Sequence, residues 1–207
     1  MVEEIGFLDV LYSTRSIRLF KAEEVSSQLI RKVLEAATQA PSGANKQPWK
    51  FLVIRDSVQK NYLGTAYLKG SAEYQGISVN KLSSEKNKSP VNYLASHFSK
   101  APVLLVVCSE CLNEGTDSNS SLNLGSSIFP AVQNILLAAR FYGLGGVITI
   151  SNRFQDQELK DALGIPKGWS ISTVIPIGYP EGKHGAKTRK HVEQVTFSDW
   201  WGSQPKF

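Results

Sequence analysis

The chain has 207 residues, of which 42% are hydrophobic and 20% are charged, a composition typical of a globular protein with a single α/β core. Its formal net charge of +5 favours anionic ligands such as phosphates. The sequence carries no arginine-rich arm, zinc-finger spacing or aromatic RNA-binding motif that would indicate nucleic-acid binding. The acidic N-terminal residues precede no apolar segment, so we expect no signal peptide. No apolar run approaches the roughly 20 residues of a membrane span, so a cytoplasmic protein without membrane contact is expected.

The first half of the chain alternates between helical and strand patterns. Residues 7–13 fit a short amphipathic helix, and a second helix begins near Ser26 and Ser27, which are good N-caps, and ends before Pro41. Residues 49–54 have a strand pattern. Residues 61–100 are rich in Lys, Ser, Asn and Gly and weakly periodic, which predicts a partly helical, mobile excursion of the kind that forms lids over sites. A plain surface loop fits this segment equally well.

The second half begins with an apolar strand at residues 103–108, which lacks polar alternation and should be buried on both faces. We expect a polar loop at 113–123, a strong helix at 128–142, a strand at 147–150, a helix at 155–163 and a strand at 171–177. The tail from Val192 carries four large aromatic residues. Because these cannot stay in water at little cost, the tail should pack on its own body or on a partner chain. With no repeat and no linker, residues 1–207 form one predicted domain.

Several types of site are unlikely from their motifs. Cys108 and Cys111 form a Cys-x-x-Cys pair, but a thioredoxin-like motif opens a helix, whereas Cys108 ends an expected strand. Structural thiols are therefore favoured, with a redox role as the lesser alternative. The histidines do not have zinc-site spacing, so no metal is expected. No P-loop, Rossmann fingerprint or G-x-S-x-G element occurs, and any enzyme chemistry would thus be carried by a cofactor.

Residues 143–146 form a glycine-rich run between an expected helix and an expected strand. A Rossmann glycine loop has the opposite order, strand before helix. A helix C-cap explains Gly143 but not all three glycines. The run should let the backbone approach a ligand or a neighbouring helix closely.

Two basic clusters could hold an anion. In the first, Arg15 and Arg18 flank Ser16, and forked cationic donors beside a hydroxyl suit a phosphate or the carbonyl edge of a flavin. The second, residues 183–191, contains Lys187 and Arg189. Each alone is more often a solvated charge run, and the pair gains weight only if folding brings the two together.

A third segment, residues 40–49, is rich in amide and hydroxyl donors between two prolines, more than a simple turn requires. Together with the basic clusters, it resembles elements of the FMN-dependent nitroreductase family, in the family's order and spacing. Residues 15–18 are similar to the family's R-S-x-R element, and residues 40–49 to its A-P-S-[SG]-x-N-x-Q-P-W element. Residues 128–145 resemble its central helix and glycine turn, and residues 175–190 its last strand and basic C-terminal element.

The resemblance implies an α+β, three-layer fold, in which a mostly antiparallel sheet of four to five strands packs between helices. It also implies an intertwined homodimer with two FMN sites at the interface, where residues 192–207 extend onto the partner subunit. Arg18 would lie near the flavin N1 and O2, and Thr149 could add a side-chain donor near the ring. By the same resemblance, the cofactor-binding residues are Arg15, Ser16, Ile17 and Arg18; Lys187 and Arg189 at the phosphate; Pro41, Ser42, Gly43 and Asn45 from the other subunit; and Ile148, Thr149 and Ile150 along the ring.

The implied activity is a ping-pong transfer of electrons from NADH or NADPH, through the flavin N5, to small acceptors such as nitroaromatics or quinones. No dedicated catalytic side chain is implied, because the flavin carries the chemistry. The chain departs from the family at Thr14, where many members have Arg, and at residues 148–150, which lack the Trp-Ile-Gly of many relatives. Alternatives are a specialised member, either a reductive dehalogenase or a flavin-consuming enzyme, for which Glu73 and Tyr74 offer part of a substrate clamp, and a non-catalytic flavin-binding or sequestering protein.

Overall fold

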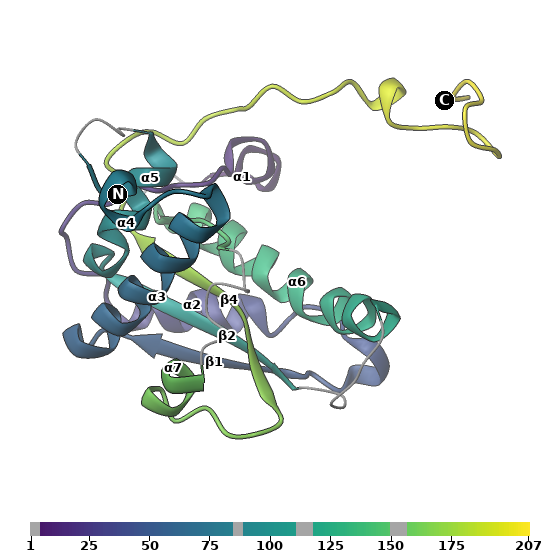
Figure 1. The fold of residues 1–207 in the computed structure, drawn as a ribbon. Helices are drawn as coiled ribbons and strands as arrows, with labels where there is room; N and C mark the ends of the chain where they lie inside the picture. Colours follow the sequence, from purple (N-terminus) through teal and green to yellow (C-terminus); the bar gives the residue numbers. More distant parts are fainter. Residues whose placement is uncertain (1–4, 85–88, 111–117, 150–156) are drawn as a thin grey trace.

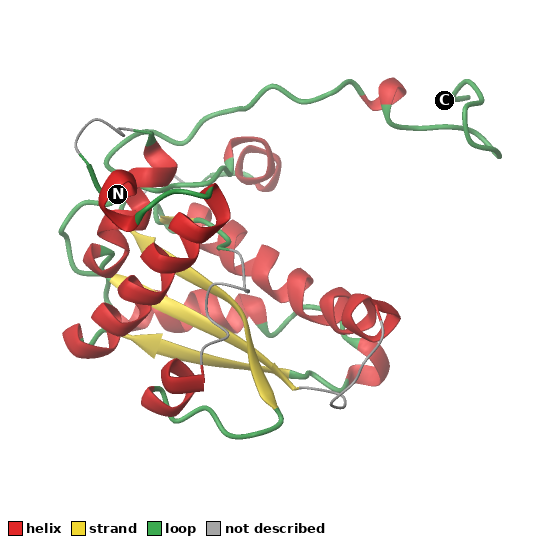
Figure 2. Ribbon diagram, viewed as in Figure 1, coloured by secondary structure: helices red, strands yellow, loops and turns green. Residues whose placement is uncertain are grey.

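A four-stranded antiparallel sheet with the order β1-β2-β4-β3 forms the centre of the molecule. The computed structural model describes residues 5–84, 89–110, 118–149 and 157–207. The strands are β1 (Trp49–Ile54), β2 (Val103–Glu110), β3 (Gly145–Gly146) and β4 (Trp169–Gly178). This sheet, with helices on both of its faces (Figures 1 and 2), confirms the predicted α+β fold.

The helices flank the sheet in two layers (Figure 1). They are α1 (Phe7–Ser13), α2 (Ser27–Ala37), α3 (Ser57–Gln75), α4 (Val79–Leu82), α5 (Pro90–His97), α6 (Ser118–Phe141) and α7 (Gln157–Ala162), with short 3-10 turns η1 (Gly43–Asn45), η2 (Phe98–Lys100) and η4 (Val192–Gln194). No helix of the described part is long and apolar enough to cross a membrane.

Strand β2 divides its side chains between two cores, which explains its uninterrupted apolar sequence. Val103, Leu105 and Val107 belong to the core shared with α2 and α6, whereas Leu104 and Val106 belong to the core shared with α3, α5 and α7. Successive strand residues point to opposite faces, so a strand covered on both sides needs apolar residues at every position. The prediction of a strand buried on both faces is confirmed.

The first core lies under α2 and α6. Ser26 caps α2, its hydroxyl accepting a hydrogen bond from the Leu29 backbone N–H at 3.3 Å, as the sequence predicted. Ile30 and Val33 then face the sheet. Gly143 ends α6 with a φ of 76°, a left-handed conformation that glycine adopts without steric cost.

The second core corrects the expectation for residues 61–100. Most of their described part is helical, and it includes side chains that are among the most deeply buried in the protein, such as Leu63, Leu82 and Phe98. The segment is therefore a structural layer over the sheet, and the plain surface-loop alternative is wrong. The helical periodicity of α3 was not recognised in the sequence, because only a narrow stripe of this helix is buried and its other positions are largely polar.

Two further boundaries differ from the predictions. Helix α6 begins at Ser118, inside the expected loop at 113–123, whose first residues lie outside the described part. The expected strand at 147–150 is not formed over its described residues: only Gly145 and Gly146 pair with β4, and Ile150 is outside the described part. Farther along, Thr149 is joined to β4 by hydrogen bonds that involve side-chain hydroxyls, as shown below.

The C-terminal tail leaves the body and extends away from it (Figure 1). Trp200, Trp201 and Phe207 are 76%, 93% and 78% exposed, and the ring of Phe197 contacts Trp201 within the tail itself. Of the two packing modes expected for the tail, packing on its own body is excluded for these residues.

Candidate functional site

Folding brings the two basic clusters to the wall of one cavity of about 410 Å³. The first cluster contributes Arg15 and Arg18, and the second contributes Lys187 and Arg189, all four predicted from the sequence. The remaining lining residues are Ser16, Ile17, Leu19, Pro90, Gly182 and Lys183. Among the described residues of the 61–100 segment, Pro90 at the start of α5 is the one that lines this cavity.

The cavity exists because two antiparallel chain segments separate along their length. The Lys21 N–H donates to the Tyr179 carbonyl at 2.9 Å, and the Glu181 N–H donates to the Leu19 carbonyl at 3.1 Å. The next backbone bond between the described parts of these segments is the long one from Gly185 N–H to the Ser13 carbonyl, at 3.4 Å. Between these anchor points the basic side chains surround open space.

The glycine turn, residues 143–146, contacts the first basic cluster directly. The Ile17 N–H donates to the Gly146 carbonyl at 3.0 Å. A Cβ on Gly145 would lie 2.5 Å from Cγ1 of Ile17, and a Cβ on Gly146 would lie 2.9 Å from the Pro176 carbonyl oxygen. The predicted close approach is therefore real, and the neighbours are the Arg15–Arg18 segment and β4.

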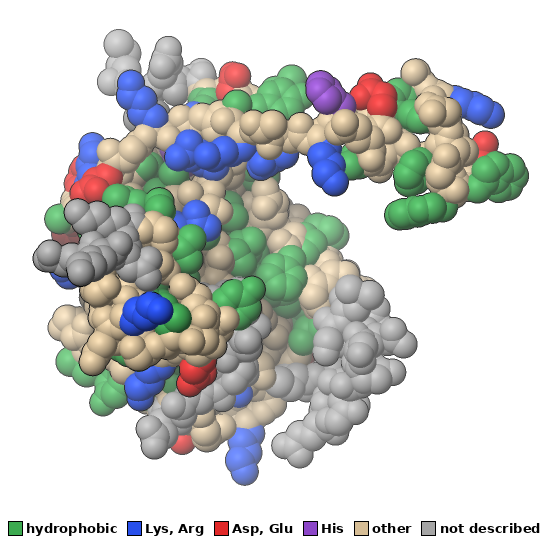
Figure 3. Space-filling model, turned by 45° about the horizontal axis from the view of Figure 1, so that its top comes forward, with side chains coloured by type: hydrophobic (Ala, Val, Ile, Leu, Met, Phe, Trp, Pro, Cys, Tyr) green, Lys and Arg blue, Asp and Glu red, His purple; other side chains and the backbone are tan. Residues whose placement is uncertain are grey.

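The positive charges around the cavity have no acidic partners among the described residues. The ion pairs found in this part of the chain, Arg31–Glu35 and Arg55–Glu24, lie elsewhere. Nε of Arg15 is buried without a hydrogen-bond partner in the structure, and an unsatisfied buried donor is costly. Lys and Arg side chains gather along the segment where the tail crosses the body (Figure 3). This arrangement suits an anionic group such as a phosphate.

Three residues at or near the cavity were not assigned to the site from the sequence: Lys183, His184 and Arg140. His184 bonds through Nε2 to the Leu144 carbonyl at 2.9 Å, and Arg140 donates through Nε to the Ser13 hydroxyl at 2.8 Å. Burial lowers the pKa of His184; the bond to Leu144 partly opposes this, and the nearby Arg140 and Arg15 lower the pKa further. Lys183 and His184 lie inside the basic run and could have been included, whereas no local signal marks Arg140.

The amide-rich segment contacts the middle of α6, away from the cavity. The Gly43 N–H donates to the Ser127 hydroxyl at 3.2 Å, and Ser127 precedes Arg140 by 13 residues on α6, a separation of about 20 Å along the helix. Within one chain, therefore, Pro41, Ser42, Gly43 and Asn45 do not line the basic cavity.

This segment nevertheless has the backbone of a specialised loop. Ala44, Asn45 and Gln47 have φ values of 50°, 54° and 51°, which non-glycine residues rarely adopt and which cluster at functional sites. The Ser42 hydroxyl accepts from the Gln47 N–H at 3.0 Å, and the Gln47 side chain donates to Oδ1 of Asn45 at 3.2 Å. These hydrogen bonds within the loop hold its backbone in this conformation.

Of the three described residues after the glycine turn, Val147 and Thr149 are buried and Ile148 is exposed. Ile148 is 41% exposed. Thr149 is buried, and its hydroxyl donates to the Val174 carbonyl at 2.6 Å while its N–H donates to the Thr173 hydroxyl at 3.2 Å. The Thr149 hydroxyl thus has no hydrogen left for a ligand, which corrects the side-chain donor role suggested for it. Ile150 lies outside the described residues.

The remaining polar candidates offer no alternative chemistry. Cys108 is buried, and burial raises the pKa of its thiol to about 11, so the reactive thiolate is disfavoured; Cys111 lies outside the described part. Among the described residues, no group of three or more His, Cys, Asp and Glu side chains could hold a metal ion.

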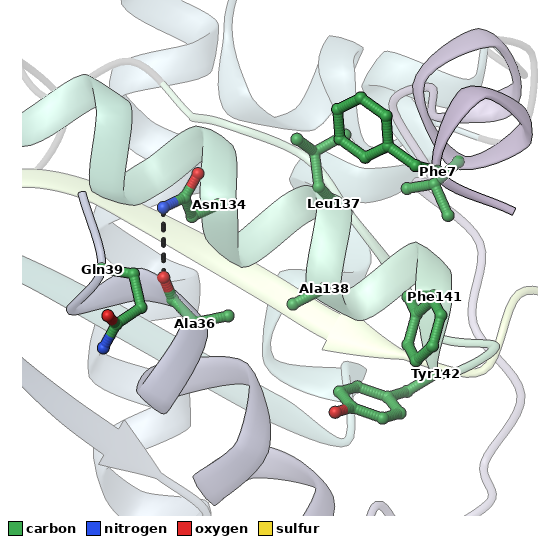
Figure 4. A pocket seen from close by; sticks show the side chains of 9 residues that line it. Phe7, Ala36, Gln39, Asn134, Leu137, Ala138, Phe141 and Tyr142 are labelled. Atoms are coloured by element: carbon green, nitrogen blue, oxygen red, sulfur yellow. Dashed lines mark hydrogen bonds between the residues drawn. The ribbon is translucent and has the colours of Figure 1, made fainter.

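A second cavity, of about 390 Å³, is apolar and lies among α1, α2 and α6 (Figure 4). Phe7, Leu137, Phe141 and Tyr142 line it, and Phe7 and Phe141 are 72% and 41% exposed. At its other side, the Asn134 amide donates to the Ala36 carbonyl at 3.1 Å. A contiguous exposed apolar surface of this kind indicates contact with another molecule.

Comparison with known proteins agrees with these features. Residues 11–179 match the model of the nitroreductase family. An Archaeoglobus fulgidus protein, provisionally named NADH dehydrogenase/NAD(P)H nitroreductase, is 29% identical over 93% of this chain and 98% of its own length. Iodotyrosine deiodinase from Thermotoga neapolitana is 26% identical over 89% of this chain and 94% of that protein. The crystal structure of an oxidized iodotyrosine deiodinase bound to FMN and 3-iodo-L-tyrosine superposes with a TM-score of 0.74 at 25% identity, covering 95% of this chain and all of that one.

Proposed function

Because the chain belongs to the nitroreductase family of flavoprotein oxidoreductases, we propose that it binds FMN and transfers electrons from NADH or NADPH to small electron-poor acceptors such as nitroaromatics or quinones. The observation that carries the proposal is the cavity in which Arg15, Arg18, Lys183, Lys187 and Arg189 converge without acidic partners among the described residues. Arg15 and Arg18 are half-buried and the three other cations are exposed; like charges gathered on one wall repel one another, and a bound anion would offset that repulsion.

The cavity fits the phosphate end of FMN. Guanidinium groups offer forked donors that match phosphate oxygens, and the buried Nε of Arg15 is a donor without a partner. We assign Arg15, Ser16, Lys187 and Arg189 to the phosphate. Arg18 and Ile17 lie on the same wall, and we assign the Arg18 guanidinium and the Ile17 carbonyl to the polar edge of the ring, since the Ile17 N–H already bonds to Gly146.

When bound, FMN supplies the redox chemistry, taking electrons from NAD(P)H and giving them to an acceptor in alternate half-reactions, which is the ping-pong scheme. The role of the protein is to bind and orient the cofactor. The Arg18 charge favours the more negatively charged, reduced state of the cofactor. Exposed Ile148, two residues after the glycine turn, offers apolar surface for the ring. We propose no catalytic side chain.

We further propose that the site is completed by a second copy of the chain in a homodimer. The loop with Pro41, Ser42, Gly43 and Asn45 lies about 20 Å away along α6 from the cavity of its own chain, so it would serve the partner's site. The apolar groove at Phe7 and Phe141 and the exposed tail, residues 192–207, supply surface for such an assembly.

A reductive dehalogenase is the second candidate. It is favoured by the similarity to two iodotyrosine deiodinases. Glu73 and Tyr74 lie together at the end of α3, and Tyr74 is 70% exposed, as a residue that clamps a substrate would be before binding. A protein that only stores flavin is the third candidate.

Anaerobic stopped-flow mixing of the FMN-loaded protein with NADH or NADPH tests the proposal. We expect bleaching of the flavin absorbance, followed by reoxidation when a nitroaromatic or a quinone is added. Reoxidation by a halogenated phenol alone would favour the dehalogenase. Bleaching without turnover of any acceptor would favour storage, and a protein that takes up no FMN would contradict all three.

A further inference from the structure

His184 connects the two halves of the cavity wall. It belongs to the second basic cluster, directly after Lys183, which lines the cavity. Its imidazole reaches inward, and Nε2 lies 2.9 Å from the carbonyl oxygen of Leu144. Leu144 directly precedes the two glycines of the turn, and the Gly146 carbonyl of that turn accepts from the Ile17 N–H of the first cluster at 3.0 Å. The same short turn therefore holds both clusters.

We propose that His184 is a positioning residue: its hydrogen bond to Leu144 holds the second basic cluster at the distance from Arg15 and Arg18 at which Lys187 and Arg189 bind the phosphate of the cofactor. The inference rests on the proposed FMN function and adds to it a residue that touches neither phosphate nor ring. His184 acts through the backbone of its own segment.

The backbone around His184 shows why a side-chain brace is needed. The two chain segments are joined by regular backbone bonds only as far as Glu181. Beyond it, in the described residues, Gly185 makes one long bond of 3.4 Å to Ser13, and a bond of that length is weak. The 2.9 Å bond of His184 is the short contact in the stretch that leads to Lys187 and Arg189.

The partner of His184 fixes the state of its ring. A carbonyl oxygen only accepts hydrogen bonds, so Nε2 carries the hydrogen, and Nδ1 is left as an acceptor in the neutral ring. Nδ1 is buried without a partner in the structure. The charged groups that act on the ring are Arg15 from the first cluster and Arg140 from α6, both cationic. They favour the neutral ring, which donates one directed bond and adds no charge.

Two substitutions at His184 can separate the role of its N–H donor from the role of its titration. Glutamine keeps an N–H donor at similar reach and cannot titrate, whereas alanine removes the donor. His97, which is on α5 and stacks on Tyr93, is absent from the cavity wall and serves as the matched control. Riboflavin, which lacks the phosphate, reports on the ring contacts alone.

The experiment measures dissociation constants of FMN and riboflavin by flavin fluorescence on the full-length wild type, H184A, H184Q and H97A, with thermal unfolding of each as a check of folding. We expect H184A to weaken FMN binding about 3- to 10-fold, the range produced by the loss of one hydrogen bond. H184Q should stay within about twofold of the wild type by the same reasoning, H97A should be unchanged, and riboflavin binding should be alike in all four.

Each other outcome decides against the inference. Equal FMN affinity in wild type and H184A, or equal losses in H184A and H184Q, would show that the donor does not position the cluster. An equal loss of FMN and riboflavin affinity in H184A would place the effect away from the phosphate. If the wild type itself bound no flavin, the proposed function would fall, and this inference with it.

Discussion

The two helical layers of the molecule differ in how completely the chain covers them. The layer of α3, α4 and α5 closes over its own core, with Leu63, Leu82 and Phe98 almost fully buried. The layer of α1 and α6 leaves Phe7, Tyr12 and Phe141 exposed around an apolar groove. The α3 side also exposes Val58 and Tyr62, so the difference lies in the apolar groove beside α1 and α6, which we propose is covered by a second copy of the chain.

The largest expected effect comes from placing a charge on the open layer. F141D should convert a dimer into a monomer at micromolar concentration and abolish FMN retention, because a carboxylate buried in an apolar contact is costly. Light scattering after size-exclusion chromatography measures the mass. V58D, on the α3 side where Val58 is also exposed, should remain dimeric; a monomeric V58D, or a dimeric F141D, would break the contrast between the layers.

The next effect tests the closed layer. F98A should lower the free energy of unfolding by about 3–5 kcal/mol, the range for truncating a buried Phe, because Phe98 is fully buried and stacks on Tyr67 with ring centroids 4.3 Å apart. V58A should change it by no more than about 0.5 kcal/mol. Urea denaturation measures both, and similar values for the two variants would contradict the assignment of the second core.

A smaller effect is expected at the basic cavity. R189A should weaken FMN binding about 10- to 100-fold, as expected for loss of a charge-assisted bond. K190A is the control, since Lys190 carries the same charge but is absent from the cavity lining. FMN titrations at two salt concentrations check the result. Equal losses of FMN affinity in R189A and K190A would mean that only the overall positive charge matters and that Arg189 makes no specific contact.

The smallest effect is the pH dependence of stability at His184. Its pKa is lowered in the folded protein, mainly by burial, so below about pH 6.5, the ordinary value for histidine, the unfolded chain takes up a proton that the folded chain resists. Stability from this group is thus complete above that pH and declines as the pH falls. Thermal unfolding of the flavin-free protein should show the wild type losing up to a few °C relative to H184Q at acid pH. Parallel curves would contradict the lowered pKa.

The sequence predicted most of this fold because the local patterns agree with the packing. The cap at Ser26, the doubly apolar strand β2 and the stop at Gly143 each depend on neighbouring residues alone. The helical layer of residues 61–100 was underestimated because its buried stripe is narrow among many polar residues. The strand expected at 147–150 does not form over its described residues, because Thr149 bonds to the β4 backbone through its side-chain hydroxyl and not through regular backbone pairing.

The site was predictable in its residue types but not in its geometry. The Arg15–Arg18 and Lys187–Arg189 clusters were identified from charge and resemblance, and folding places both on one wall. The roles of His184 and Arg140 were not predicted. Each depends on a hydrogen bond to a residue far away in the sequence, which only the folded structure reveals. Whether residues 41–45 reach the partner's cavity remains a prediction that rests on the second copy.

The glycine turn carries an evolutionary consequence. Because a methyl group at Gly145 would collide with Ile17 and one at Gly146 with the backbone of β4, drift at either codon is blocked even though neither residue offers a functional group. Gly182, on the cavity wall but with open space around its would-be Cβ, is free to vary. Among descendants of this chain, we therefore expect substitutions at Gly182 to be tolerated, while Gly145 and Gly146 stay glycine because both basic clusters contact their turn.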